Sequence, residues 1–327
     1  MTFIARRLAF YLVAAWAAIT VNFFIPRAMP GNAVDSMMAK FPNLQAQARK
    51  ALEAEFGTGH QGSIIHQYWV YLGDLFHLNL GTSVSLYPDK VTSVLASTIP
   101  WTVALVGTAT IISFVIGTLL GIFAAWRRGG LLDQGLPALT FLQATPYFFL
   151  ALVAIEFFAI DLHIFPISGG YTLGVTPGWN TAFIGSAVYH SLLPALTIVV
   201  TSMAGWMLQM RNVMITTIGE DYVLAAQAKG LAPRRVIFTY AARNAILPNI
   251  AGFALAIGFV VAGALVMEIV FSYPGVGLTL YNAVQANDYP LTQGIFLVIS
   301  FAVLFACIIA DVIYVIADPR VRSRQSY

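Results

Sequence analysis

Charge is scarce in this sequence, and its scarcity indicates which solvent surrounds the chain. Only 9% of the 327 residues are charged and 59% are hydrophobic, whereas a soluble domain carries roughly 25% charged residues. The mean hydropathy is +0.78. The apolar residues form continuous runs rather than an alternating pattern, which favours membrane-spanning helices over a β-barrel. We therefore expect an integral membrane protein.

Signatures of catalytic and nucleotide-binding sites are also missing. The single cysteine, Cys307, cannot form an intrachain disulfide or a thiolate metal site. The five histidines form no His-Glu-x-x-His motif, and no Gly-x-Ser-x-Gly motif occurs, so metallohydrolases and serine hydrolases have no support. No lysine follows a glycine, so the chain lacks a Walker A loop to hold phosphates. The sequence predicts a chain without enzymatic activity, cofactor or metal.

Long uncharged segments predict the membrane spans. No charged residue occurs between Lys90 and Arg127, or between Arg243 and Glu268, and a helical span needs about 20 apolar residues. We predict an all-α polytopic membrane protein, with residues 1–327 forming a single transmembrane domain. Its six transmembrane helices are expected at 8–26, 101–126, 135–160, 190–210, 249–267 and 291–310.

The basic residues predict the orientation of these spans. With the N-terminus inside, 12 of the 17 lysines and arginines fall in cytoplasmic segments, as the excess of positive charge on that side requires. Both termini are then cytoplasmic. The net charge of +3 follows from the same rule, so nucleic-acid binding has little support.

The largest expected loop is extracytoplasmic and spans residues 27–99, between the first two spans. Apolar residues recur in it at three- and four-residue spacing from Ile64 to Phe76, which predicts an amphipathic helix on the outer membrane surface or against the bundle. The charged segment 43–56 indicates a second, more solvated helix. Residues 161–189, rich in glycine and aromatic residues, are expected to form a structured loop.

A polar, helix-forming segment at 218–243 predicts a cytoplasmic docking element. Glu220 and Asp221 suit the start of a helix, Gly230 suits its C-terminal cap, and Pro233 suits the first turn of a second helix that carries Arg234 and Arg235. On the first helix, four side chains are expected on one face that another protein can approach closely: Tyr222, Ala225, Ala226 and Lys229. The alternative is an interfacial helix on lipid headgroups.

Other residues of the spans leave several interpretations open. Acidic side chains within spans can anchor and pair helix ends, can add polarity to a transport pathway, or can relay protons in a secondary transporter; the candidates are Glu156, Glu268 and Asp311. Aromatic residues can line a pathway or simply pack, and the candidates are Phe141, Tyr147, Phe148, Phe149 and Trp206. Close helix approach is expected at Gly252, Gly258 and Gly263 of the fifth span.

The docking segment also carries a family resemblance. Ala225-Ala226-x-x-x-Gly230, followed by Ile246-Leu247-Pro248, resembles the cytoplasmic loop of bacterial ABC importer permeases. In the generic form of this loop a glutamate precedes the two alanines, and here Leu224 stands in its place. The gap from Gly230 to Pro248 is also longer than in the generic form. Both departures resemble the oligopeptide/dipeptide permease subfamily. Similar matches run along the chain, at Ala5–Leu8, Pro30–Gly31, Leu80–Gly81, Phe271–Gly277, Asp288–Pro290, Asp311 and Asp318–Arg320.

The resemblance implies a multi-pass permease of the bacterial plasma (inner) membrane. Its partners would be a second homologous permease, two ATP-binding subunits that hold ATP and magnesium, an extracytoplasmic solute-binding protein and the lipid bilayer. The docking helix would be the coupling helix, with the ATPase-coupling residues Glu220, Asp221, Tyr222, Ala225, Ala226, Lys229, Gly230, Arg234 and Arg235. Oligopeptides or dipeptides are the expected cargo, with β-linked oligosaccharides as the alternative.

Overall fold

The computed structural model describes residues 2–28, 63–261 and 264–317, and this part of the chain is almost entirely helical. Three helices are long and apolar enough to cross a membrane: Val91–Trp126, Thr181–Ile218 and Tyr289–Val312. Two bent helix pairs raise the number to as many as five, and a shorter apolar helix covers Ala9–Ile25. These elements fall on the six predicted spans. A helical, polytopic membrane protein is thereby confirmed for the described residues, and the number of six spans stays a prediction.

The helix of the third predicted span is broken rather than continuous. Helix Ala138–Ala144 and helix Tyr147–Asp161 meet at an angle of 101°. The break falls at Thr145, whose backbone is extended, directly before Pro146. Proline lacks an N–H and disfavours the helical conformation of the residue before it, which explains the bend.

The fifth predicted span also differs from expectation. Helix Pro233–Ala245 leads into helix Leu247–Phe259 through a bend of 53°, and the second helix ends well before the expected residue 267. Its C-cap is Val260. Gly252 makes the expected close approach, since an added Cβ would lie 3.3 Å from the Trp206 ring. Gly258 is buried, and Gly263 lies outside the described residues.

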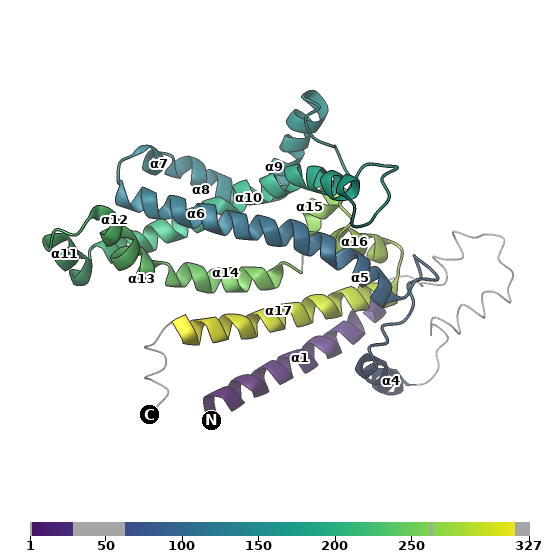
Figure 1. The fold of residues 1–327 in the computed structure, drawn as a ribbon. Coiled ribbons are helices and arrows are strands. Elements are labelled where there is room, and N and C mark those ends of the chain that lie inside the picture. The colour runs from purple at the N-terminus through teal and green to yellow at the C-terminus, as the bar shows by residue number, and fades with distance from the viewer. Residues whose placement is uncertain (1, 29–62, 262–263, 318–327) are drawn as a thin grey trace, which may run out of the picture. The chain divides into compact units, whose positions relative to one another are not determined.

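The chain divides into two compact units. The first contains helix α1 at its N-terminal end and the start of α17 (Figure 1). Its elements are α1 (Thr2–Ala28), α4 (Ile64–Phe76), α5 (Val91–Thr102), α16 (Val276–Gln285) and α17 (Tyr289–Ala317), the last of which continues into the second unit.

The predicted amphipathic helix at Ile64–Phe76 is present as α4, and it lies against α1. Ser63 caps its first turn by accepting a hydrogen bond from the His66 amide at 3.3 Å. The Tyr68 hydroxyl is 2.8 Å from the Thr20 hydroxyl of α1. Ile65 and Trp69 remain 71% and 66% exposed. The helix predicted at 43–56 lies outside the described residues.

Asp288, part of the Asp-Tyr-Pro motif, fixes the start of α17. Its buried carboxylate accepts hydrogen bonds from the hydroxyls of Ser83 and Ser85, at 2.5 and 2.7 Å, and from the Ser85 amide at 2.8 Å. The Leu291 amide donates to the other oxygen at 3.1 Å. Four donors offset much of the desolvation of a buried charge, so Asp288 ties the segment before α5 to α17.

The second unit is built around the long helix α10. Its α-helices are α6 (Thr108–Trp126), α7 (Leu131–Gln134), α8 (Leu136–Ala144), α9 (Tyr147–Ala154), α10 (Thr181–Ile218), α11 (Asp221–Ala228), α12 (Pro233–Arg235), α13 (Arg243–Ala245), α14 (Leu247–Phe259) and most of α15 (Leu265–Val270). Wider π-helical turns cover Val103–Gly107, Ile155–Asp161 and Val236–Ala242. In Figure 1, α6 runs alongside α10, and α8 lies on the other side of this pair from α14.

The loop between α9 and α10 is structured, as predicted, although it ends sooner. The Gly169 amide donates to the Phe271 carbonyl at 2.8 Å, and the Thr172 amide donates to the Ser186 hydroxyl at 2.8 Å. Helix α10 begins at Thr181, so the expectation that the loop reaches residue 189 was wrong. Asn180 starts the helix by accepting a hydrogen bond from the Phe183 amide.

Candidate functional site

Helix α11 lies where the sequence places the docking helix, and both of its ends are formed by the expected residues. The Glu220 carbonyl accepts from the amides of Val223 and Leu224, which makes Glu220 the N-cap. Gly230 has a φ of +71°, in the left-handed region. Its amide donates to the Gln227 carbonyl and the Leu231 amide donates to the Ala226 carbonyl, the Schellman pattern of a helix that ends at glycine.

A second helix follows at once, as predicted from Pro233. Pro233 occupies the first turn of helix Pro233–Ala245, where its missing N–H costs nothing. The side chains of Arg234 and Arg235 are exposed. The Asn244 side-chain amide donates to the Tyr222 hydroxyl at 2.9 Å. This hydrogen bond joins the two helices of the loop to each other.

A hydrophobic cluster, which we call the inner cluster, attaches α11 to the ends of two long helices. Its buried members are Ile122, Ala125, Met210, Met214, Val223, Ala226, Val236, Ile237, Ala241, Ala242 and Ala245. They come from α6, α10, α11 and helix Pro233–Ala245. Helix α11 is therefore packed against both α6 and α10 through buried side chains.

The predicted docking face needs one correction. Ala226 is only 2% exposed and belongs to the inner cluster, so it cannot contact another protein. Tyr222, Ala225 and Lys229 are exposed, and so is Leu224. Val223 and Ala226 are spaced by three residues and share the buried face. The expectation for Ala226 rested on its small size, but a small residue also suits close packing inside the chain.

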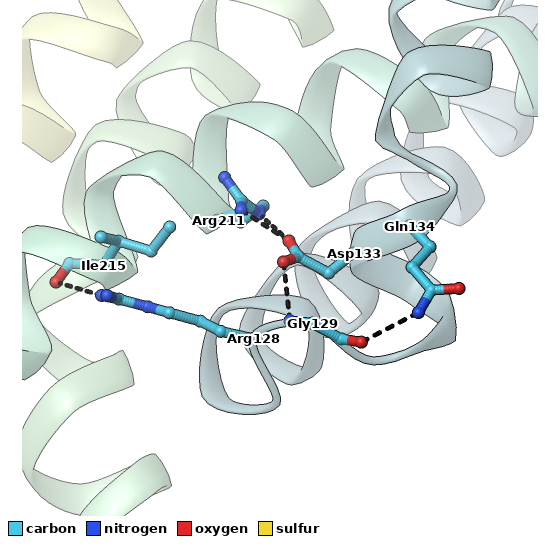
Figure 2. A network of polar contacts seen from close by, with 6 residues as sticks. All are labelled: Arg128, Gly129, Asp133, Gln134, Arg211 and Ile215. Atoms are coloured by element: carbon cyan, nitrogen blue, oxygen red, sulfur yellow. Dashed lines mark hydrogen bonds and ion pairs between the residues drawn. The ribbon is translucent and has the colours of Figure 1, made fainter.

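An ion pair that the sequence analysis missed fixes the turn before α8 to α10 (Figure 2). The Arg211 guanidinium contacts the Asp133 carboxylate at 2.5 and 2.7 Å, and the Gly129 amide donates to the other carboxylate oxygen at 2.9 Å. Arg128 donates to the Ile215 carbonyl at 3.3 Å. The Gly129 hydrogen bond, followed by the Arg211 guanidinium, lowers the pKa of Asp133 below its ordinary value.

The acidic candidates occupy different environments. Glu156 is exposed on the π-helical turn after α9, Glu268 is fully buried in α15, and Asp311 is half-buried in α17. Among the described residues, no group of three or more histidine, cysteine, aspartate or glutamate side chains could hold a metal ion.

The aromatic candidates also lie in different surroundings. Trp206 and Tyr147 border two neighbouring cavities of the second unit, which share Gln143 and Ser202. Phe141 and Phe149 are 72% and 58% exposed, as expected of side chains that face lipid. Phe148 makes an edge contact with Phe149.

Comparison with known proteins gives the family. Residues 117–323 match the family described as binding-protein-dependent transport system inner membrane component. The di/tripeptide transport system permease protein DppB of Pseudomonas aeruginosa is 32% identical, over 99% of this chain and 100% of that protein.

Two further relatives match over nearly the whole chain. The oligopeptide transport system permease protein AppB of Bacillus subtilis is 29% identical, with 98% of each chain covered. The dipeptide transport system permease protein DppB of Escherichia coli is also 29% identical, over 99% of this chain and 100% of that protein. The chain therefore belongs to the family of inner membrane components of binding-protein-dependent transport systems.

Proposed function

We propose that this chain is a permease subunit of an ATP-driven importer, and that it forms half of a pathway for oligopeptides or dipeptides. Relatives named as di/tripeptide, oligopeptide and dipeptide permeases, similar over nearly the full length, support the cargo class. The oligosaccharide alternative has no such support. A binding protein outside the membrane delivers the peptide, and a second homologous permease completes the pathway.

In the proposed topology the chain crosses the membrane six times, with both termini in the cytoplasm. Five spans correspond to the three long helices and two bent pairs, and α1 supplies the sixth. The arginines of the turn before α8 and of the α11 loop then lie inside, as the positive-inside rule favours. The loop of residues 27–99 lies outside.

Energy comes from partner subunits in this proposal. Two ATP-binding subunits hold ATP and magnesium, and the permease carries no nucleotide site of its own because its sequence lacks a Walker A loop. Uptake by reconstituted complex should stop when ATP is removed and should survive collapse of the proton gradient. The reverse result would favour the proton-coupled alternative.

The observation that carries the coupling proposal is the attachment of α11 to the membrane helices. The inner cluster holds α11 against the ends of α6 and α10, while Tyr222, Leu224, Ala225 and Lys229 face outward. Glu220, Asp221, Arg234 and Arg235 surround this face with exposed charge. An ATP-binding subunit that receives the outward face in a groove could move α6 and α10 through it.

A bulky substitution on the outward face tests this proposal. Ala225→Leu should leave the permease folded, because Ala225 is exposed, but should uncouple ATP hydrolysis from uptake or detach the ATP-binding subunits. Ala182→Leu is the matched control, since Ala182 is an exposed alanine near the opposite end of α10.

The readouts are copurifying ATPase and peptide uptake per ATP in proteoliposomes. A lipid-facing α11 predicts that leucine is tolerated, because lipid accepts an apolar side chain. Wild-type uptake per ATP in Ala225→Leu would remove the coupling role from this face.

A further inference from the structure

The second unit contains a hollow of about 660 Å³ between α6, α8, α10 and α14. Every residue that lines it belongs to a candidate membrane span, yet seven of the eleven lining residues carry polar side chains. The polar side chains that matter here are Thr140, Gln143, Ser202, Gln209 and Asn212. None of the lining residues is charged.

The polar residues of α10 form one stripe along its length. Ser202, Gln209 and Asn212 stand seven and then three residues apart, which places them on the same face of a helix. All three are exposed within the described structure. Exposing amide side chains to hydrocarbon is costly because lipid offers them no hydrogen bonds. This face is therefore expected to meet water, cargo or protein rather than lipid.

The break in the third span is an independent indication that this region does not face lipid. A second hollow of about 270 Å³ includes Thr145 and Pro146 at the 101° bend, and it shares Gln143 and Ser202 with the first. Irregular backbone at membrane depth is tolerated where it is buried in protein or lines a water-filled cavity. The two hollows form one polar track along the same side of α10.

The surface of the track carries almost no net charge. Arg211 precedes Asn212 on α10, but its guanidinium is paired with Asp133. Amides and hydroxyls both donate and accept hydrogen bonds. Such a surface suits the uncharged N–H and C=O groups of a peptide main chain and does not select cargo by side-chain charge.

We propose that this track is the surface of the translocation pathway that contacts the peptide main chain. The inference rests on the proposed peptide-import function and adds the residues and the chemistry of recognition. Gly205 lies at the middle of the track, where an added Cβ would make an ordinary contact 3.6 Å from Nε2 of Gln143, so a longer side chain there would fill the space.

Filling the track provides the first test. Gly205→Leu should preserve assembly with the second permease and stimulation of ATPase activity by loaded binding protein, while lowering uptake at least tenfold. Gly185→Leu is the matched control on the same helix, because an added Cβ at Gly185 meets nothing within 4 Å. Unchanged uptake in Gly205→Leu would overturn the proposal. Loss of the second permease from the purified complex would also overturn it, because the track would then be a subunit interface.

A charge in the track provides a second test that changes little volume. Gln209→Glu should reduce uptake of acidic peptides about tenfold relative to basic peptides of equal length, whereas the wild type treats both alike. An equal effect on both peptides, or none, would contradict the proposal. If the assembled wild-type complex itself imports no peptide, the proposed function fails, and this outcome is distinct from failure of the variants.

Discussion

Helices α6 and α10 pack through two glycines of α6, and this contact gives a sharp stability prediction. Gly117 and Gly121 lie four residues apart and are both buried. A Cβ at Gly121 would lie 2.6 Å from the Met207 carbonyl oxygen and 2.7 Å from the Met210 Cβ. Ordinary contacts of a Cβ begin near 3.4 Å. Because one of these neighbours is backbone, Gly121→Ala must push the helices apart.

The magnitude follows from two opposing effects. Overpacking a well-packed site costs about 1–3 kcal/mol, whereas replacing a helical glycine by alanine gains up to about 1 kcal/mol from helix propensity. Gly185→Ala on α10 has the propensity gain without the clash, since nothing lies within 4 Å of an added Cβ. The two variants should therefore differ by about 1–3 kcal/mol, with Gly121→Ala the less stable.

Thermal unfolding of the purified complex in detergent measures this difference. Gly121→Ala should lower the midpoint temperature relative to the wild type, and Gly185→Ala should leave it unchanged or raise it. Equal midpoints for the two alanine variants would refute the inferred close approach of α6 and α10.

Three further predictions concern the end of the second unit that carries α11. The pKa of Asp133 is lowered in the folded protein, so its carboxylate contributes stability above its ordinary pKa of about 3.9 and loses it as pH falls through the lowered value. The difference in thermal midpoint between the wild type and Asp133→Asn should therefore become smaller as the pH is lowered. A difference that stays the same down to the lowest pH at which the protein folds would contradict this prediction. Arg211→Gln should retain part of this pH dependence, because the Gly129 amide still donates to the carboxylate. Gly230→Val should destabilise the α11 loop by at least about 1–2 kcal/mol, because non-glycine residues are strained at positive φ. The control variant is Gly73→Ala, at a helical glycine with open space around it. Equal midpoints of thermal unfolding for the two variants would refute this prediction.

The sequence predicted helices well where hydrophobicity and caps agree. The docking helix has an acidic start and a glycine end, and the structure places α11 between Glu220 and Gly230. The amphipathic pattern from Ile64 gives α4 with the expected limits. Both results depend on interactions within one or two helical turns, which a local stretch of sequence contains.

Breaks within apolar segments were harder to predict, although one signal was available. Pro146 lies inside the largely apolar third span, and the hydrophobic run continues through it, so composition alone indicates one helix. The conformation of Thr145 before this proline is a local effect that the hydropathy average conceals. The Asp133–Arg211 pair joins residues 78 positions apart, and no local pattern reports such a contact.

Which face of a helix is buried depends on what surrounds it, and this explains the remaining errors. Small size suggested that Ala226 faces a partner, but the structure places it in the inner cluster because α6 and α10 lie on that side. Conversely, the stripe Ser202, Gln209 and Asn212 was visible at helical spacing within an apolar run. A polar stripe on a membrane helix indicates that this face does not contact lipid, because an amide without partners in hydrocarbon costs several kcal/mol. An exposed aromatic ring is less informative, because it can pack equally well against lipid or protein. In a chain with so little charge, the uncharged polar residues are therefore the better guide to the pathway.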